Sequence, residues 1–300
     1  MEINKKTYFY IGFLSLIALA LYSLLIFTYD VQNFRHLIFW SILAIIVESL
    51  LVPLPNNSVG ISVGYAVNIA SVIVAGPRIA TTSSMLGFLL RVPNVTGRGY
   101  IHAFNVPLYK TVFNVSQSII VTSIISLVYL FTGGIVGEFS SLSTIIILLL
   151  GIVLNTTIIS GFLTVSTGQP FYQVWATNVK GMFPSAIAVG TIGIIIALAY
   201  IGYGYGAVLL FFGPLLLARY SFKLYIDMRN LYLSTIQALN KTVEAKDPYT
   251  SGHAARVEKL AVGLAKAYNL PYASIQNIKT AAILHDIGKI GIDDSILNKA

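Results

Sequence analysis

The chain has no cysteine and very little charge. Its 300 residues include 19 Lys and Arg and 11 Asp and Glu, so charged side chains make up 10% of it, against roughly 25% in soluble proteins. The absence of cysteine excludes disulfide frameworks, thiolate catalysis and cysteine-ligated zinc. Apolar residues make up 56%, which excludes a disordered chain and predicts that much of the protein lies in lipid.

The few charges are unevenly distributed. Residues 1–218 hold 8 basic and 4 acidic side chains, whereas the remaining 82 residues hold 11 and 7. This change predicts a polytopic membrane domain over 1–218, which would act as a sensor or anchor. A signalling or linker helix is expected over 219–243, and a water-soluble segment over 244–300.

The first domain contains apolar runs that could cross a bilayer. We expect eight spans, or six or seven if the region Ile61–Val92 enters and leaves by the same face. Five runs are clear: Tyr8–Thr28, Leu37–Val52, Thr111–Phe131, Leu142–Thr164 and Phe183–Ile201. Three runs are shorter or rich in small residues: Ile61–Ala75, Ile79–Val92 and Ala207–Ala218.

The basic residues predict the orientation of these spans. With eight spans and a cytoplasmic N-terminus, the outside loops hold only Arg35 and Arg78, as the positive-inside rule expects. The inside loops then hold Lys5, Lys6, Arg91, Arg98, Lys110, Lys180, Arg219 and Lys223. Both termini would be cytoplasmic. The net charge of +8 is therefore an orientation signal, and we expect no nucleic-acid polymer as a partner.

Some polar residues lie within the apolar runs. They could form an ion or small-molecule site, or they could form hydrogen bonds between helices that hold the bundle together. These residues are Glu48, Asn68, Asn114, Gln117 and Asn155.

Beyond Arg219 an apolar stripe at steps of three and four predicts a long helix. The stripe could pair with its twin in a homodimer through the 219–243 helix, or it could pack onto its own domain. Its members are Tyr225, Met228, Tyr232, Ile236, Leu239 and Val243.

A short cluster near the C-terminus has residues suited to phosphoester chemistry. His285 and Asp286 are adjacent at the end of a predicted helix, which is expected to run through His285 and end near Gly288 or Gly291. Imidazole and carboxylate ligands suit Mn, Fe, Zn or Ni. Lys289 shares their face and could neutralise charge on a phosphate.

Two phrases then identify a resemblance. They are Lys246-Asp-Pro-Tyr-Thr-Ser-Gly-His253 and His285-Asp-Ile-Gly-Lys-Ile-Gly-Ile292, and they resemble the HD-GYP branch of the HD metal-dependent phosphohydrolases. The resemblance implies an all-α fold, in which a membrane helix bundle precedes the N-terminal helices of an all-helical HD domain. It also implies that His253, His285 and Asp286 are metal ligands, while Lys289 contacts the substrate phosphate and acts with Asp286 in catalysis.

The family implies a function as well. HD-GYP enzymes hydrolyse the bacterial messenger cyclic di-GMP by in-line attack on phosphorus, with two divalent ions such as Fe or Mn. The resemblance thus implies a cyclic dinucleotide substrate and a place in the bacterial inner membrane, with regulation through the membrane domain.

The resemblance also implies that further ligands and the Gly-Tyr-Pro motif lie beyond Ala300. We therefore expect that these 300 residues lack a complete site, so enzyme activity of this chain stays open. The alternatives are an HD phosphohydrolase acting on another nucleotide, or a catalytically inactive membrane sensor or scaffold.

Overall fold

A computed structural model divides the chain into two compact units, Met1–Leu216 and Leu217–Ala300. The structure describes residues 4–31, 33–50, 64–95, 99–246, 252–268, 270 and 272–297. We name the first unit the membrane module and the second the C-terminal unit. The boundary lies beside the change in charge after residue 218.

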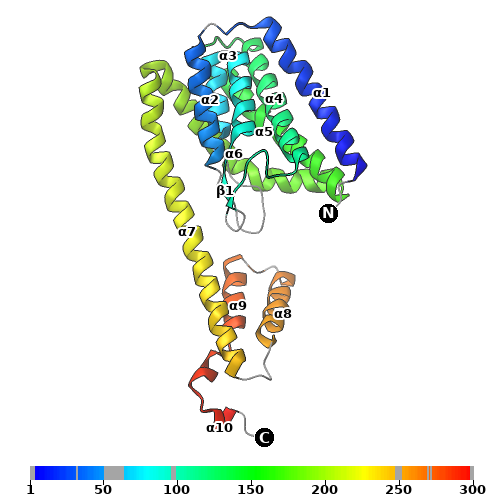
Figure 1. Ribbon diagram of the computed structural model, residues 1–300, viewed down its shortest axis with the longest axis vertical. Helices are drawn as coiled ribbons and strands as arrows, with labels where there is room; N and C mark the ends of the chain where they lie inside the picture. The colour runs from blue at the N-terminus through cyan, green and yellow to red at the C-terminus, as the bar shows by residue number, and fades with distance from the viewer. Residues whose placement is uncertain are drawn as a thin grey trace. The chain divides into compact units, whose positions relative to one another are not determined.

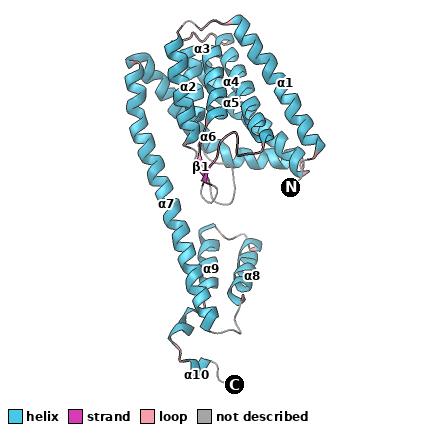
Figure 2. Cartoon of the chain, in the orientation of Figure 1, coloured by secondary structure: helices cyan, strands magenta, loops and turns pink. Residues whose placement is uncertain are grey.

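The fold is all-α (Figures 1 and 2). Among the described residues, the two strands are only two residues long and pair antiparallel, β1 (Asn94–Val95) with β2 (Gly99–Tyr100). The helices of the membrane module are α1 (Lys5–Thr28), α2 (Phe34–Ser49), α3 (Gly64–Leu90), α4 (Leu108–Phe131), α5 (Ser141–Thr167) and α6 (Phe171–Tyr203). Helix α7 (Tyr205–Lys246) begins in the module and ends in the C-terminal unit.

Five described helices are long and apolar enough to cross a membrane, namely α1, α3, α4, α5 and the Phe183–Tyr203 part of α6. Four of the clear runs in the sequence lie within α1, α4, α5 and α6. The run expected at Leu37–Val52 lies in α2, which has only 16 residues, and residues 51 and 52 lie outside the described ones. The run Ala207–Ala218 is the start of α7.

Helix α3 is broken into two arms at Gly76. This residue has φ 81° and ψ 175°, a conformation open almost only to glycine, and Pro77 follows it. Beyond the break, the Arg78 guanidinium donates to the Tyr29 carbonyl at 3.0 Å, just after the end of α1. At the far end of the second arm, the Val92 amide donates to Ser49 Oγ at 2.9 Å, at the end of α2. The second arm therefore runs alongside α2 and in its direction.

The first arm of α3 approaches the break from inside the bundle. Its Tyr65 hydroxyl donates to the Leu148 carbonyl in α5 at 2.7 Å. Near the break, the Ile73 carbonyl accepts from the Gly137 amide at 2.9 Å, in the loop between α4 and α5. The chain thus reverses at Gly76, and the two expected spans Ile61–Ala75 and Ile79–Val92 are short arms of one broken helix. Residues 61–63 lie outside the described ones.

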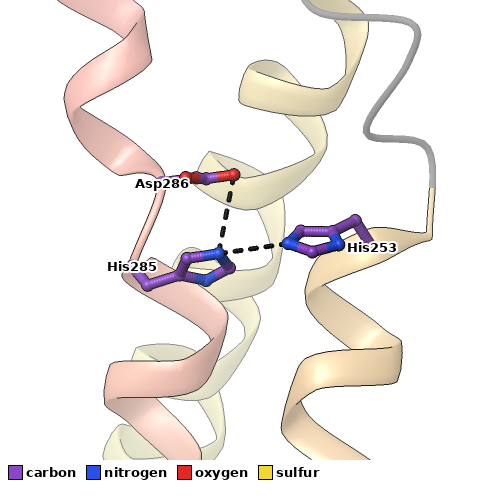
Figure 3. Close-up of side chains that lie close together, drawn as sticks. All are labelled: His253, His285 and Asp286. Atoms are coloured by element: carbon purple, nitrogen blue, oxygen red, sulfur yellow. Dashed lines mark hydrogen bonds and ion pairs between the residues drawn. The ribbon is translucent and has the colours of Figure 1, made fainter.

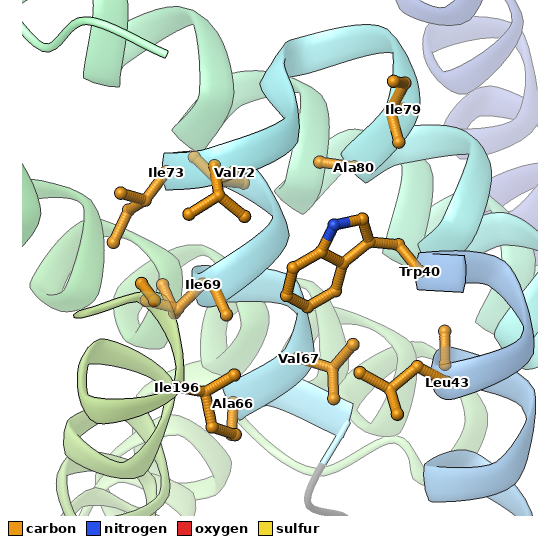
Figure 4. Close-up of a cluster of buried hydrophobic side chains, with 14 of the residues drawn as sticks. Trp40, Leu43, Ala66, Val67, Ile69, Val72, Ile73, Ile79, Ala80 and Ile196 are labelled. Atoms are coloured by element: carbon orange, nitrogen blue, oxygen red, sulfur yellow. The ribbon is translucent and has the colours of Figure 1, made fainter. Parts of the chain in front are cut away.

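The core of the module surrounds these arms (Figure 4). The indole of Trp40 on α2 is fully buried and lies beside Val67 and Ala80, one from each arm of α3. On the other side, Gly193 of α6 comes so near that a β-carbon there would lie 2.6 Å from the Ala66 carbonyl oxygen. Apolar packing on all sides holds the broken helix in place.

Some polar groups inside the module are paired between helices. Gln117 Nε2 on α4 donates to Asn155 Oδ1 on α5. Buried Glu48 at the end of α2 forms an ion pair with Arg91 at 3.5 Å. These contacts favour the packing role over an ion site for these three polar residues.

Two regions without an assigned role also join helices. The His36 imidazole lies 3.0 Å from the Tyr200 hydroxyl, which ties α2 to α6. Gly204 has φ 71° and is the single residue between α6 and α7. Gly204 therefore makes the tight turn between these helices.

The C-terminal unit is smaller. After α7 it contains α8 (His253–Ala267), α9 (Tyr272–Leu284), the 3-10 helix η3 (Ile287–Gly291) and α10 (Asp294–Leu297). Lys279 of α9 and Glu258 of α8 form an ion pair at 3.2 Å. From the α7 stripe, Ile236 and Val243 are buried, whereas Met228, Tyr232 and Leu239 are exposed. The stripe is therefore divided between packing within the chain and an open face.

Candidate metal centre

Two breaks in the helices bring the predicted ligands together (Figure 3). Gly252 has φ 68°, and directly after it α8 begins with His253. A β-carbon at Gly252 would also lie 3.2 Å from the Arg256 guanidinium, so glycine suits this position in both conformation and space. Helix α9 ends at Leu284, and His285 and Asp286 occupy the turn between α9 and η3.

This turn corrects the helix expected from the sequence. We predicted that the helix continues through His285 to Gly288 or Gly291, but the α-helix ends at Leu284 and η3 covers 287–291. Adjacent residues on an α-helix point about 100° apart, whereas a turn frees them from that constraint. His285 and Asp286 can therefore both face His253.

The three side chains converge closely. His253 Nε2 and His285 Nε2 lie 3.3 Å apart, and His285 Nε2 lies 3.6 Å from Asp286 Oδ2. One potential ligand atom from each residue lies within 4.8 Å of the other two. Two nitrogen ligands that each lie about 2.1 Å from one ion, in tetrahedral geometry, are about 3.4 Å apart. The spacing of the imidazoles therefore fits a shared divalent ion.

The orientation of His285 also suits a metal ligand. Its Nδ1 lies 2.9 Å from the Ala282 carbonyl oxygen, which can only accept a hydrogen bond. Nδ1 therefore carries the proton, and in the neutral ring the lone pair is on Nε2, which faces His253 and Asp286. Metal-binding histidines commonly have such a carbonyl partner, which fixes both the tautomer and the ring plane.

Lys289 lies at the edge of the same cluster. Residues three apart eclipse one another in a 3-10 helix, and Lys289 Nζ donates to Asp286 Oδ2 at 2.9 Å. This hydrogen bond holds the pKa of the Asp286 carboxyl below its ordinary value, and the neighbouring imidazole of His285 acts in the same direction. Asp286 is therefore ionised at neutral pH, as a metal ligand must be.

The structure thus brings together His253, His285, Asp286 and Lys289. Residues 247–251 of the upstream phrase, including Tyr249, lie outside the described residues. The Ala282 carbonyl and the left-handed Gly252 were missed in the sequence. Gly252 could have been noticed only as a residue that permits a positive φ. No residue type signals the carbonyl.

Part of the chain is similar to known proteins. Residues 250–300 match the family model of the HD domain. Over 76 residues the chain is 38% identical to the 3'3'-cGAMP-specific phosphodiesterase 3 of Vibrio cholerae, and the match covers 25% of this chain and 16% of that protein. Over 84 residues it is 33% identical to the cyclic di-GMP phosphodiesterase of Thermotoga maritima, covering 28% of this chain and 23% of that protein.

The chain thus spans less than a quarter of each of these relatives. No solved structure is significantly similar to it. The match to the family model lies in the C-terminal unit, where the two histidines and the aspartate converge. Residues 250–300 are therefore similar to the HD domain, whose superfamily consists of metal-dependent phosphohydrolases.

Proposed function

We propose that the chain belongs to a membrane-bound phosphodiesterase of the HD-GYP type, which hydrolyses a cyclic dinucleotide. The observation that carries this proposal is the convergence of His253, His285 and Asp286, with His285 Nδ1 anchored on a carbonyl. The two relatives named above act on 3'3'-cGAMP and cyclic di-GMP. Both compounds are therefore candidate substrates.

The residues of the chain have distinct roles in this proposal. His253, His285 and Asp286 hold a divalent ion, with Fe or Mn suited to this mixture of nitrogen and oxygen ligands. Bound divalent ions supply water activation and stabilise charge on the phosphate oxygens. Lys289 keeps Asp286 ionised through its hydrogen bond, and its ammonium lies where it can also attract a substrate phosphate.

Two ions need more ligands than three side chains offer. We therefore propose that the full site uses further donors beyond His253, His285 and Asp286. We also propose that the membrane module lies in the bacterial inner membrane with both termini cytoplasmic, and that it regulates the HD domain through α7. The two ends of the module differ in charge as this orientation requires, because Lys5, Lys6, Arg91 and Lys110 lie at one end and Arg78 at the other.

The test uses the product of the whole reading frame, from codon 1 to the first stop codon. Purified with Mn²⁺, it is expected to cleave cyclic di-GMP or 3'3'-cGAMP, and the variant Asp286→Ala should lose this activity. Cleavage of a different nucleotide would favour the other HD phosphohydrolases. If the wild-type protein binds Mn²⁺ no more tightly than the Asp286→Ala variant does, the catalytic functions are excluded. The remaining function is then that of a catalytically inactive membrane sensor or scaffold.

A further inference from the structure

A groove runs along the outward face of α1, next to the end of α5. It has a volume of about 430 Å³ and is lined by Lys5, Lys6, Phe9, Tyr10, Phe13 and Val165. The two lysines are exposed and lie in the first turn of α1. Phe9 and Phe13 are also exposed, at 80% and 54%. The groove therefore has a charged mouth and an apolar body.

Two lysines lie at the mouth of the groove. The first turn of α1 has no acidic residue, and the positive end of the helix dipole adds to the two ammonium groups. The described carboxylates of the module lie elsewhere. Asp30 and Glu48 form ion pairs with Arg78 and Arg91, and Glu138 lies in the loop between α4 and α5. Among the described residues, charge complementarity at this mouth thus favours an anion.

The body of the groove favours an apolar occupant. Helix α1 rises 1.5 Å per residue, so Phe13 lies about 12 Å beyond Lys5 along the axis. The Tyr10 hydroxyl already donates to the Ile158 carbonyl at 3.0 Å, so its ring serves as a wall. An occupant would therefore be charged at one end and apolar along a length of several carbon atoms.

Neighbouring residues indicate the depth of this mouth in the membrane. Tyr8 of α1 and Tyr109 of α4 contact edge to face with 6.4 Å between ring centroids. Lys110 Nζ lies 5.9 Å from the Tyr109 ring centre. Tyrosines and lysines gather where a bilayer meets water. The lysines of the mouth are thus at the level of lipid headgroups.

We propose that this groove binds an anionic phospholipid, with its phosphate at Lys5 and Lys6 and an acyl chain along Phe9, Phe13 and Val165. This inference rests on the insertion of the module in a membrane, which is part of the proposed function. It is independent of catalysis, and it assigns to α1 the binding of an anionic lipid.

The test uses the full chain, purified in a neutral detergent and titrated with phosphatidylglycerol or with phosphatidylcholine of the same acyl chains. Native mass spectrometry and thermal unfolding report binding. We expect phosphatidylglycerol to bind about tenfold more tightly than phosphatidylcholine, because each lysine near an anionic headgroup adds electrostatic attraction. The double variant Lys5→Gln/Lys6→Gln should lose the preference. Lys180→Gln, an exposed lysine on α6 outside the groove, should keep it.

A second variant tests the apolar body of the groove. Phe9→Ala/Phe13→Ala should weaken binding of phosphatidylglycerol, and glycerol phosphate alone should bind neither protein at these concentrations. Equal binding of both lipids would overturn the proposal. Equal binding of glycerol phosphate would also overturn it, because that result would indicate a site for free phosphate. A dimer that the phenylalanine variant dissociates would overturn it too, because a second copy of the chain would then fill the groove.

Membrane fractionation separates this inference from the proposed function. A chain that sediments with membranes but shows no lipid preference overturns only the lipid site. A chain that does not sediment with membranes overturns both.

Discussion

The two units of the chain hold the same kind of ion pair in different surroundings. In the membrane module, Glu48 is buried and pairs with Arg91 at 3.5 Å. In the C-terminal unit, Glu258 and Lys279 pair at 3.2 Å, but their side chains remain 27% and 34% exposed. The polar groups of the module therefore stabilise contacts between helices. Those of the C-terminal unit converge at an exposed site, where they are available to bind.

The largest loss of stability is expected for a substitution of Gly193 in the membrane module. In Gly193→Ala the new β-carbon would meet the backbone of Ala66, which cannot move aside as a side chain could. We expect a loss of about 3 kcal/mol in the free energy of unfolding, at the upper end of overpacking effects. Thermal unfolding in detergent measures it. Gly202→Ala on the same helix is the control, since no atom lies within 4 Å of its β-carbon position. Equal stability of both variants would contradict the close packing of α3 against α6.

The opposite pattern is expected at the metal centre. His285→Ala should weaken Mn²⁺ binding by about 100-fold, or roughly 2.7 kcal/mol, because it removes one of three ligands. Unfolding should change little, since the side chain of His285 is 36% exposed. Isothermal titration calorimetry with Mn²⁺ measures the affinity. His102→Ala, in the loop between β2 and α4, is the matched control. Unchanged affinity in His285→Ala would contradict the site.

The two ion pairs provide a direct comparison. Glu48→Gln leaves the Arg91 charge in a half-buried place without its carboxylate, and we expect a cost of about 2 kcal/mol. Glu258→Gln breaks a pair that is more open to solvent, and it should cost about 0.5 kcal/mol. Hydrogen exchange reads each unit separately, through the amides of α2 and α3 and those of α8 and α9. Similar losses of unfolding free energy in Glu48→Gln and Glu258→Gln would contradict the proposed difference between the ion pairs of the two units.

The sequence predicted the features that depend on local pattern. Apolar runs gave the positions of α1, α4, α5 and most of α6, because a bilayer requires about 20 apolar residues in a helix. The candidate ligands His253, His285 and Asp286 could be named because their motif is specific, and the structure brings their side chains together. The predicted helix end near Gly288 or Gly291 was wrong, because the apolar periodicity continues through Ile287 and does not mark the turn that follows Leu284.

The sequence predicted the two short runs on either side of Gly76 and Pro77, but not that they are the arms of one broken helix. Gly76 and Pro77 can break a helix, but the direction of the chain after the break depends on distant contacts. Here Val136 and Gly137 of the loop between α4 and α5 contact the break, and Arg78 contacts the end of α1. The Ala282 carbonyl that orients His285 was hidden for the same reason, since every residue has a carbonyl group.

A smaller effect than that of Glu48→Gln is expected on the open face of α7. Met228, Tyr232 and Leu239 are spaced by four and seven residues, so they share a face, and all three are exposed. If this face pairs with a second copy, Tyr232→Glu would bring two like charges together and weaken self-association about tenfold, or roughly 1.4 kcal/mol. Ser234→Glu places the same charge on the opposite, exposed side of the helix and should leave association unchanged.

Sedimentation of the whole chain in detergent measures this association across micromolar concentrations. A wild-type chain that stays monomeric throughout would contradict the homodimer. The stripe would then serve only to pack Ile236 and Val243 within the C-terminal unit, where both are buried. A dimer weakened by Tyr232→Glu alone would show that the exposed half of the stripe pairs between copies while the buried half packs within each chain.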